Sequence, residues 1–79
     1  MDAKELREII IEEIDFGRTH LAQDKDITDN IMIDVEQYAN QRVIEELEES
    51  IKDVIDYKEG DNVVVDRILS RLISLKLKQ

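Results

Sequence analysis

The longest uninterrupted helical pattern in the chain runs from Ile31 to Glu59 and is followed by Gly60. Its apolar residues recur at every fourth position, namely Ile31, Val35, Ala39, Val43, Leu47, Ile51 and Ile55. Because an α-helix turns once in about 3.6 residues, each step moves the row about 40° around the helix. One neighbour could not cover such a row. We therefore predict a central helix over about residues 28–59 that packs on one element near its start and on another near its end.

The polar triplet Asn40, Gln41 and Arg42 interrupts the middle of this pattern. In a continuous helix, the triplet marks the place where the buried face changes from one neighbour to the other. A break of the helix at the triplet is the competing explanation. We favour the continuous helix.

The segment before the central helix predicts a shorter helix over about residues 3–22. Asp2 with Glu5 three residues later is typical of a capping box. Gly17 allows two interpretations: it ends the helix as a left-handed residue, or it lies within the apolar stripe while Leu21 continues the helix. The longer helix uses more of the sequence. The polar residues 23–30 then form a break, with Asp26 or Thr28 as the N-cap of the central helix.

The C-terminal segment predicts a third helix over about residues 62–78. Its apolar residues occupy half of a helical wheel: Val64, Val65, Ile68, Leu69, Leu72, Ile73 and Leu75. This arc spans about 180°, whereas packing on one side needs a stripe of roughly 100°. The extra width predicts a second contact surface in another subunit. The residues expected at this oligomer interface are Val65, Ile68, Leu69, Leu72 and Ile73.

Composition narrows the fold class. The 79 residues form one domain, and they include no cysteine, no proline and only two glycines. A β-rich fold needs frequent turn residues, and a disulfide framework needs cysteines. We therefore predict an all-α fold: a small three-helix domain with a long central helix. A core of this size is marginal for a monomer, so we expect a homodimer or a higher oligomer.

The charge balance is acidic, with 20 Asp and Glu against 11 Lys and Arg and a net charge of −9. Residues 1–60 alone carry a net charge of −11. A negative field argues against direct binding of nucleic acid or of an anionic membrane. The first residues lack the basic and apolar regions of a signal peptide, and no apolar run reaches membrane-spanning length. A cytoplasmic protein is the expectation.

Two acidic clusters are candidate sites for binding a partner protein. Carboxylates at residues 5, 8, 12 and 15 share the polar face of the first helix, about 5 Å apart along its axis. A second cluster lies in the central helix. A solvated, helix-favouring surface is the simplest interpretation. The alternative is a surface that occupies a basic groove of a partner, formed by Glu5, Glu8, Glu12, Asp15, Glu45, Glu48 and Glu49.

Metal sites are less well supported by the sequence. Asp24, Asp26 and Thr28 match the first ligands of a calcium loop, but its sixth position is Asp29 instead of glycine and its twelfth is Val35 instead of glutamate. All-helical, magnesium-dependent pyrophosphohydrolases use Glu-x-x-Glu on one helix and Glu-x-x-Asp on the next. This chain has Glu12-x-x-Asp15 and Glu45-x-x-Glu48, in the reverse order. We predict no metal and no cofactor.

Three functional hypotheses follow from these patterns. The first is a non-catalytic, acidic helical interaction module, in its sharper form a phage-type inhibitor that presents carboxylates to a nucleic-acid-binding protein. The second is an oligomeric nucleotide-binding protein that holds its ligand between subunits through Arg18, His20, Arg67 or Arg71. The third is a magnesium-dependent enzyme similar to the all-α nucleotide pyrophosphohydrolases. We favour the first, because one histidine and three helical serines do not make a nucleophilic site.

Overall fold

The described part of the protein, residues 1–52 and 62–78 of a computed structural model, is helical and contains no strand. Its helices are α1 (Ala3–Thr19), α2 (Asp24–Tyr38), α3 (Gln41–Ser50) and α5 (Asn62–Lys78). The predicted all-α class is confirmed. The expected end of the central helix at Gly60, the packing of Ile55 and the turn at 60–62 lie outside the described residues. No described helix is both long enough and apolar enough to cross a membrane.

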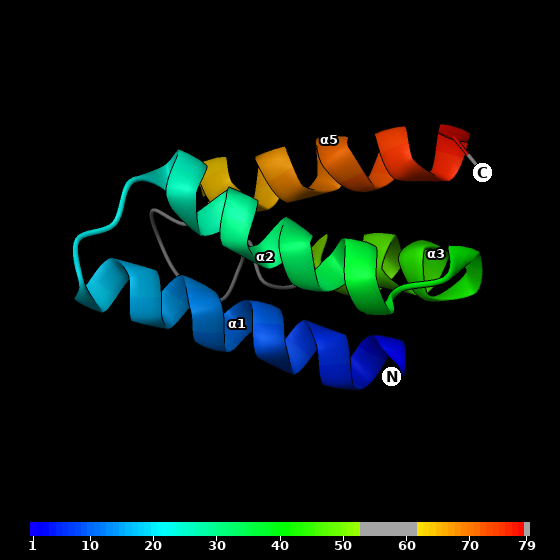
Figure 1. Cartoon of the computed structure of the whole chain (residues 1–79), viewed down its shortest axis with the longest axis horizontal. Coiled ribbons are helices and arrows are strands. Elements are labelled where there is room, and N and C mark those ends of the chain that lie inside the picture. The colour runs from blue at the N-terminus through cyan, green and yellow to red at the C-terminus, as the bar shows by residue number, and fades with distance from the viewer. Residues whose placement is uncertain (53–61, 79) are drawn as a thin grey trace.

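The helices alternate in direction along the long axis of the molecule, and both chain ends lie at the same end (Figure 1). The closest helix pairs are α1 with α2, α1 with α3, α2 with α5, and α3 with α5. Each described helix therefore packs on two others. This ring encloses an aliphatic core made of Leu6, Ile10, Ile14, Ile27, Ile31, Met32, Val35, Val43, Ile44, Leu47, Ile51, Val64, Val65, Ile68 and Leu72. Burial of each such side chain stabilises the fold by roughly 1.5–3 kcal/mol before conformational entropy is subtracted.

The helix predicted over residues 28–59 breaks at Asn40, within the polar triplet where the competing explanation expected a break. Ala39 and Asn40 both have extended backbone conformations, and the Asn40 side chain accepts a hydrogen bond of 2.9 Å from the backbone N–H of Val43. This bond caps α3, because it satisfies a backbone donor that the first turn of a helix leaves unpaired. The prediction of one helix over 28–59 is therefore wrong. The chain reverses at Ala39–Asn40, and α3 runs back antiparallel to α2 (Figure 1).

The reversal also changes the explanation of the four-residue steps. Ile31 and Val35 are buried on α2, while Val43 and Leu47 are buried on α3. The row belongs to two helices that each turn an apolar face to the same core. The rotation inferred for a single long helix is not needed, because each half contacts both α1 and α5.

The start of α1 was predicted correctly, and its end lies between the two predicted positions. Asp2 caps α1 by accepting a hydrogen bond of 2.8 Å from the N–H of Glu5. The helix ends at Thr19, because the N–H of Ala22 donates to the carbonyl of Gly17 at 2.8 Å and the N–H of Leu21 donates to that of Arg18 at 3.2 Å. These two bonds form a Schellman motif.

The wide apolar arc of α5 is covered within one chain. Val65, Ile68 and Leu72 are fully buried, because α5 packs on α2 with one part of the arc and on α3 with another. These three residues of the predicted oligomer interface are therefore part of the intrachain core. Leu69 is half-buried and Ile73 is 48% exposed, so only these two remain accessible to a second copy.

The helix α2 begins at Asp24, earlier than predicted, with Gln23 as its N-cap. Gln23 makes no side-chain cap hydrogen bond. Thr28, one of the two predicted caps, is instead buried in the second turn, where its hydroxyl donates to the Asp24 carbonyl at 2.8 Å. Because this hydroxyl donates to a carbonyl of its own helix, it is not left unpaired in the core, and the threonine is tolerated there.

Leu21 occupies a position that usually requires glycine. Its φ is 56°, in the left-handed region, and its side chain is 89% exposed. The left-handed conformation costs a residue with a β-carbon about 1–2 kcal/mol, and the exposed side chain gains little by burial. We expect Leu21→Gly to raise the free energy of unfolding by about 0.5–1 kcal/mol in chemical denaturation. Leu21→Ala removes the side chain but keeps the strain, so it should bring no gain. Equal gains from both variants would contradict this explanation.

Gly17 is needed for the close approach of α1 and α2. A β-carbon at this position would lie 2.5 Å from Cγ1 and 2.7 Å from Cδ1 of Ile27, which is itself buried. Gly17→Ala should lower the free energy of unfolding by about 1–2 kcal/mol, since overpacking outweighs the higher helix propensity of alanine. In an Ile27→Ala background, which removes both contacting atoms, the same change should stabilise the protein. A cost that is the same in both backgrounds would show that the overlap is not its cause.

Candidate functional site

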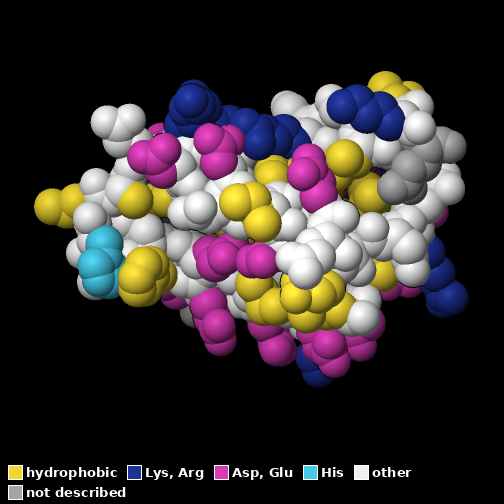
Figure 2. Space-filling model, viewed as in Figure 1, with side chains coloured by type: hydrophobic (Ala, Val, Ile, Leu, Met, Phe, Trp, Pro, Cys, Tyr) yellow, Lys and Arg dark blue, Asp and Glu magenta, His cyan; other side chains and the backbone are white. Residues whose placement is uncertain are grey.

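The α1 carboxylates form an exposed row on the outer face of the molecule. Glu5, Glu8 and Glu12 are exposed, and Asp15 continues the row as a partly buried residue. The opposite face of α1 is buried in the core. Acidic side chains crowd the lower edge in Figure 2, where Figure 1 shows α1 to lie. Glu5, Glu8 and Glu12 have no ion-pair partner among the described residues, so their charges face solvent directly.

The α3 carboxylates lie in a different environment. Glu48 accepts a hydrogen bond of 3.0 Å from the Lys76 ammonium group, which raises the pKa of Lys76. Glu46 pairs with Arg42 at 3.3 Å. The shallow depression that holds Glu45, Glu48 and Glu49 therefore also contains two cations, from α3 and α5.

The two acidic clusters are separated by basic residues at the contact between α1 and α3. Lys4 and Arg7 line this contact together with Glu46 and Ser50, and the Arg7 Nε donates to the Ser50 carbonyl at 3.3 Å. The depression at the α3 cluster is lined by no carboxylate of α1. The seven carboxylates predicted for the partner surface thus fall into a solvent-facing row on α1 and a partly neutralised group on α3.

An apolar groove of about 580 Å³ lies between α1 and α2, next to the acidic row. Its small and aliphatic lining residues are Gly17, Ala22 and Ile27, and its large ones are Phe16 and Ile33. Phe16 is 65% exposed and Ile33 is 60% exposed, which is unusual for large apolar side chains that could join a core. Neither residue was predicted to lie in a site. The one available signal was their position beside the apolar stripe instead of within it.

His20 contacts Phe16, and both residues line the groove. The two rings stack with centroids 4.0 Å apart and planes inclined by 28°. The His20 Nδ1 lies 2.8 Å from the Phe16 carbonyl, and it donates to that oxygen in the tautomer that carries its proton on Nδ1. The histidine side chain is visible beside a hydrophobic side chain at one end of the molecule (Figure 2).

Glu13, which lines the same groove, forms a carboxyl pair with Asp34 of α2. The pKa of Glu13 rises to about 7 because burial removes water, and because a hydrogen bond to Asp34 and the Asp34 charge both favour the protonated form. The Glu13 Oε2 is buried with no hydrogen-bond partner among the described residues. Glu12 and His20 are the other titratable residues that line the groove. This pair was not predicted from the sequence, since it joins two helices.

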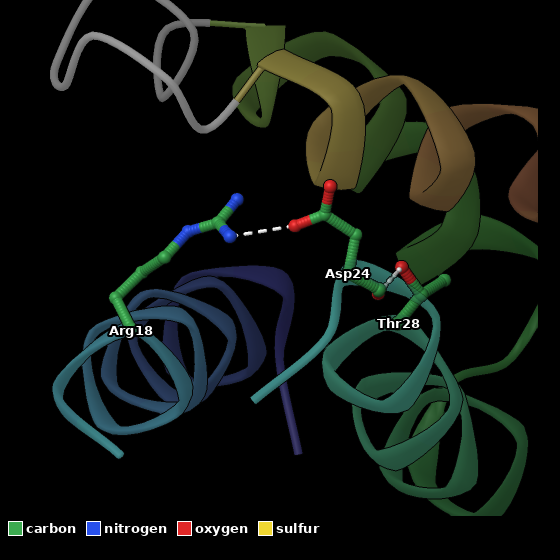
Figure 3. Close-up of polar contacts among 3 residues, drawn as sticks. All are labelled: Arg18, Asp24 and Thr28. Carbon is green, nitrogen blue, oxygen red and sulfur yellow. Dashed lines mark hydrogen bonds and ion pairs between the residues drawn. The ribbon is translucent and has the colours of Figure 1, made fainter. Parts of the chain in front are cut away.

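The residues predicted for nucleotide binding lie in two separate places. Arg18 pairs with Asp24 at 2.6 Å, so that the end of α1 is tied to the start of α2 beside the Thr28 hydroxyl (Figure 3). Arg71 pairs with Asp29 at 2.7 Å, and it lines with Arg67 a depression between α2 and α5. His20 lines the groove between α1 and α2 instead. One chain does not bring these four side chains together.

The predicted absence of a resident metal stays a prediction, and in the described residues no three His, Cys, Asp or Glu side chains are placed so that they could hold a metal ion. The carboxylate of Asp24, the first residue of the calcium-like pattern, forms an ion pair with Arg18. The chain matches no protein family, no curated protein and no solved structure.

The carboxyl pair predicts a specific dependence of stability on pH. The folded-state pKa of Glu13 is about 7 against 4.5 in the unfolded chain, so the folded protein binds more protons between these values and its stability falls as pH rises through them. Glu13→Gln keeps a hydrogen-bond donor for Asp34 without the charge. We expect this variant to match the wild type near pH 4.5 and to be more stable by about 1 kcal/mol near pH 8, after discounting for solvent screening.

Chemical denaturation across this pH range measures the difference. Glu8→Gln removes one exposed carboxylate from the same helix and is the matched control, whose offset from the wild type should stay constant across the range. A Glu13→Gln offset that is equally constant would contradict the assignment of the proton to this pair.

Proposed function

We propose that this protein is a non-catalytic interaction module that binds a basic surface of a partner protein through the α1 carboxylate row. The observation that carries the proposal is the exposure of Glu5, Glu8 and Glu12 on one face, without ion-pair partners among the described residues. Carboxylates that are already hydrated and unpaired are available to a cationic partner without breaking an intrachain ion pair. On α3, by contrast, Glu48 would have to give up Lys76, and Glu46 would have to give up Arg42.

The rigidity of α1 supports a role in recognition. Leu6, Ile10 and Ile14 are almost fully buried along its length, and the Asp2 cap and the Schellman motif define both ends. A rigid helix holds its carboxylates at fixed positions, which lowers the entropy lost when a partner binds. Long-range attraction to a basic surface also raises the association rate.

In the sharper form of the proposal, the partner is a nucleic-acid-binding protein and this chain is its inhibitor. The α1 carboxylates succeed one another at spacings of three, four and three residues, which is about 5 Å along the axis on average. Flexible side chains at this interval approximate a row of backbone phosphates, whose rise is about 3.4 Å per nucleotide along one strand. A groove built for phosphates would then accept the acidic row in their place.

The two alternative functions receive less support. Two of the four residues named for the nucleotide hypothesis, Arg18 and Arg71, are engaged in intrachain ion pairs with aspartates. The pyrophosphohydrolase hypothesis needs the carboxylates of two helices around one magnesium ion. No described group of three or more such residues has that arrangement.

Neutralisation of the acidic row tests the proposal. Immobilised wild-type protein should retain a partner from a nuclease-treated host lysate at low salt, and retention should fall as salt screens the charges. The triple variant Glu5→Gln, Glu8→Gln and Glu12→Gln should bind that partner at least about tenfold more weakly, which corresponds to about 1.4 kcal/mol. Titration of the purified partner against each variant measures the affinity.

A matched triple variant controls for net charge. Asp26→Asn, Glu36→Gln and Asp66→Asn also remove three exposed acidic charges, from α2 and α5, and should bind almost as the wild type does. If the two triple variants lost the same affinity for the partner, the loss would depend on net charge alone. The role of α1 would then be overturned. A partner whose affinity ignores salt concentration would overturn the acidic-surface mechanism as a whole.

A further inference from the structure

The groove between α1 and α2 continues the acidic row and adds an apolar component to it. Glu12 belongs to both features, because it is exposed within the row and also lines the groove. The ionisable residues among the described lining are Glu12, Glu13 and His20, and none of that lining is lysine or arginine. The groove therefore combines large exposed apolar side chains with carboxylates on one edge.

We propose that this groove binds a cationic amphipathic helix of the partner, whose apolar side chains insert between Phe16 and Ile33 while its lysines or arginines face Glu12 and Glu13. The inference rests on the proposed function, because it names the class of segment that the acidic module recognises. Insertion of an amphipathic helix into a groove is an established mode of peptide recognition.

The apolar part of the groove is suited to side chains of such a helix. Phe16 from α1 and Ile33 from α2 are each more than half exposed, and the lining residues Gly17 and Ala22 are small. An inserted leucine or tryptophan would cover both large side chains from water. Removal of apolar surface from water would then drive binding at the centre of the contact, as is typical of interface cores.

The polar part of the groove specifies a cation. The buried Glu13 Oε2 has no hydrogen-bond partner among the described residues, and Asp34 adds a second carboxyl beside it. An ammonium or guanidinium group from the partner would be attracted by the exposed Glu12 carboxylate at the edge of the groove. An acidic helix would instead be repelled by the Glu12 charge. Charge complementarity therefore selects a basic helix over other apolar occupants.

A designed peptide tests this proposal directly. The probe is a short helical peptide with leucines on one face, lysines on the other and one tryptophan within the apolar face. Because the protein contains no tryptophan, all tryptophan fluorescence comes from the peptide. We expect binding at low salt with a blue shift of the emission, since the indole leaves water when it enters the groove. A peptide with glutamate in place of every lysine should not bind.

Two charge-matched variants locate the binding site. Ile33→Lys places a cation in the groove, and Ile73→Lys places one on α5 at a position of similar exposure, 48% against 60%. Both add one positive charge, so general electrostatics affects them equally. Ile33→Lys should weaken binding at least about tenfold, whereas Ile73→Lys should change it less than about twofold. Thermal denaturation confirms that both variants are folded.

The outcomes separate this inference from the proposed function. A peptide of the same composition, scrambled to remove its apolar face, should bind more weakly and without a blue shift. If the scrambled peptide binds equally well, or if the two lysine variants lose affinity equally, the groove proposal is overturned while the acidic surface stands. Binding of the glutamate peptide as tightly as the lysine peptide would overturn the predicted charge preference. If neither cationic peptide binds at low salt, both proposals fail.

Discussion

The architecture depends on the cap that Asn40 provides for α3. Once its side chain accepts the Val43 N–H, the backbone at Ala39 and Asn40 is extended, and the chain reverses instead of continuing as one helix. The reversal lets α2 and α3 turn their apolar faces to one core. A continuous helix of that length would have spread the same residues over two contacts. It would also have left the wide face of α5 without enough cover in a single chain.

Helix periodicity predicted α1 and α5 as separate helices, because the amphipathic faces of residues 3–19 and 62–78 each follow a helical repeat. It failed at Asn40, where one side-chain hydrogen bond competes with a helical pattern that remains regular on both sides. Both apolar rows continue in phase across the break, so spacing alone could not distinguish one helix from two. The Schellman motif was similarly hidden, since the residue in the left-handed position is Leu21, whereas glycine is the usual signal.

The candidate site was harder to predict than the fold, because its main parts come from two helices. The acidic row on α1 is visible in the sequence, since its members share one helix face. The contact between Glu13 and Asp34 and the groove bounded by Phe16 and Ile33 depend on how α1 and α2 pack. The same limit explains the error at α5. Its wide apolar arc indicated two contacts correctly, but the sequence could not show that both contacts, with α2 and α3, lie within one chain.

The groove and the stability of the α1–α2 pair have a common physical origin in side-chain size. Gly17 lets Ile27 approach the axis of α1 so closely that a β-carbon would overlap it. Ala22, just after the Schellman turn, is also small. Phe16 and Ile33 are more than half exposed and line the groove beside this contact. The same arrangement of α1 and α2 therefore gives close packing at the contact of Gly17 with Ile27 and exposed apolar surface beside it. A mutation that loosens this contact should also change the shape of the groove.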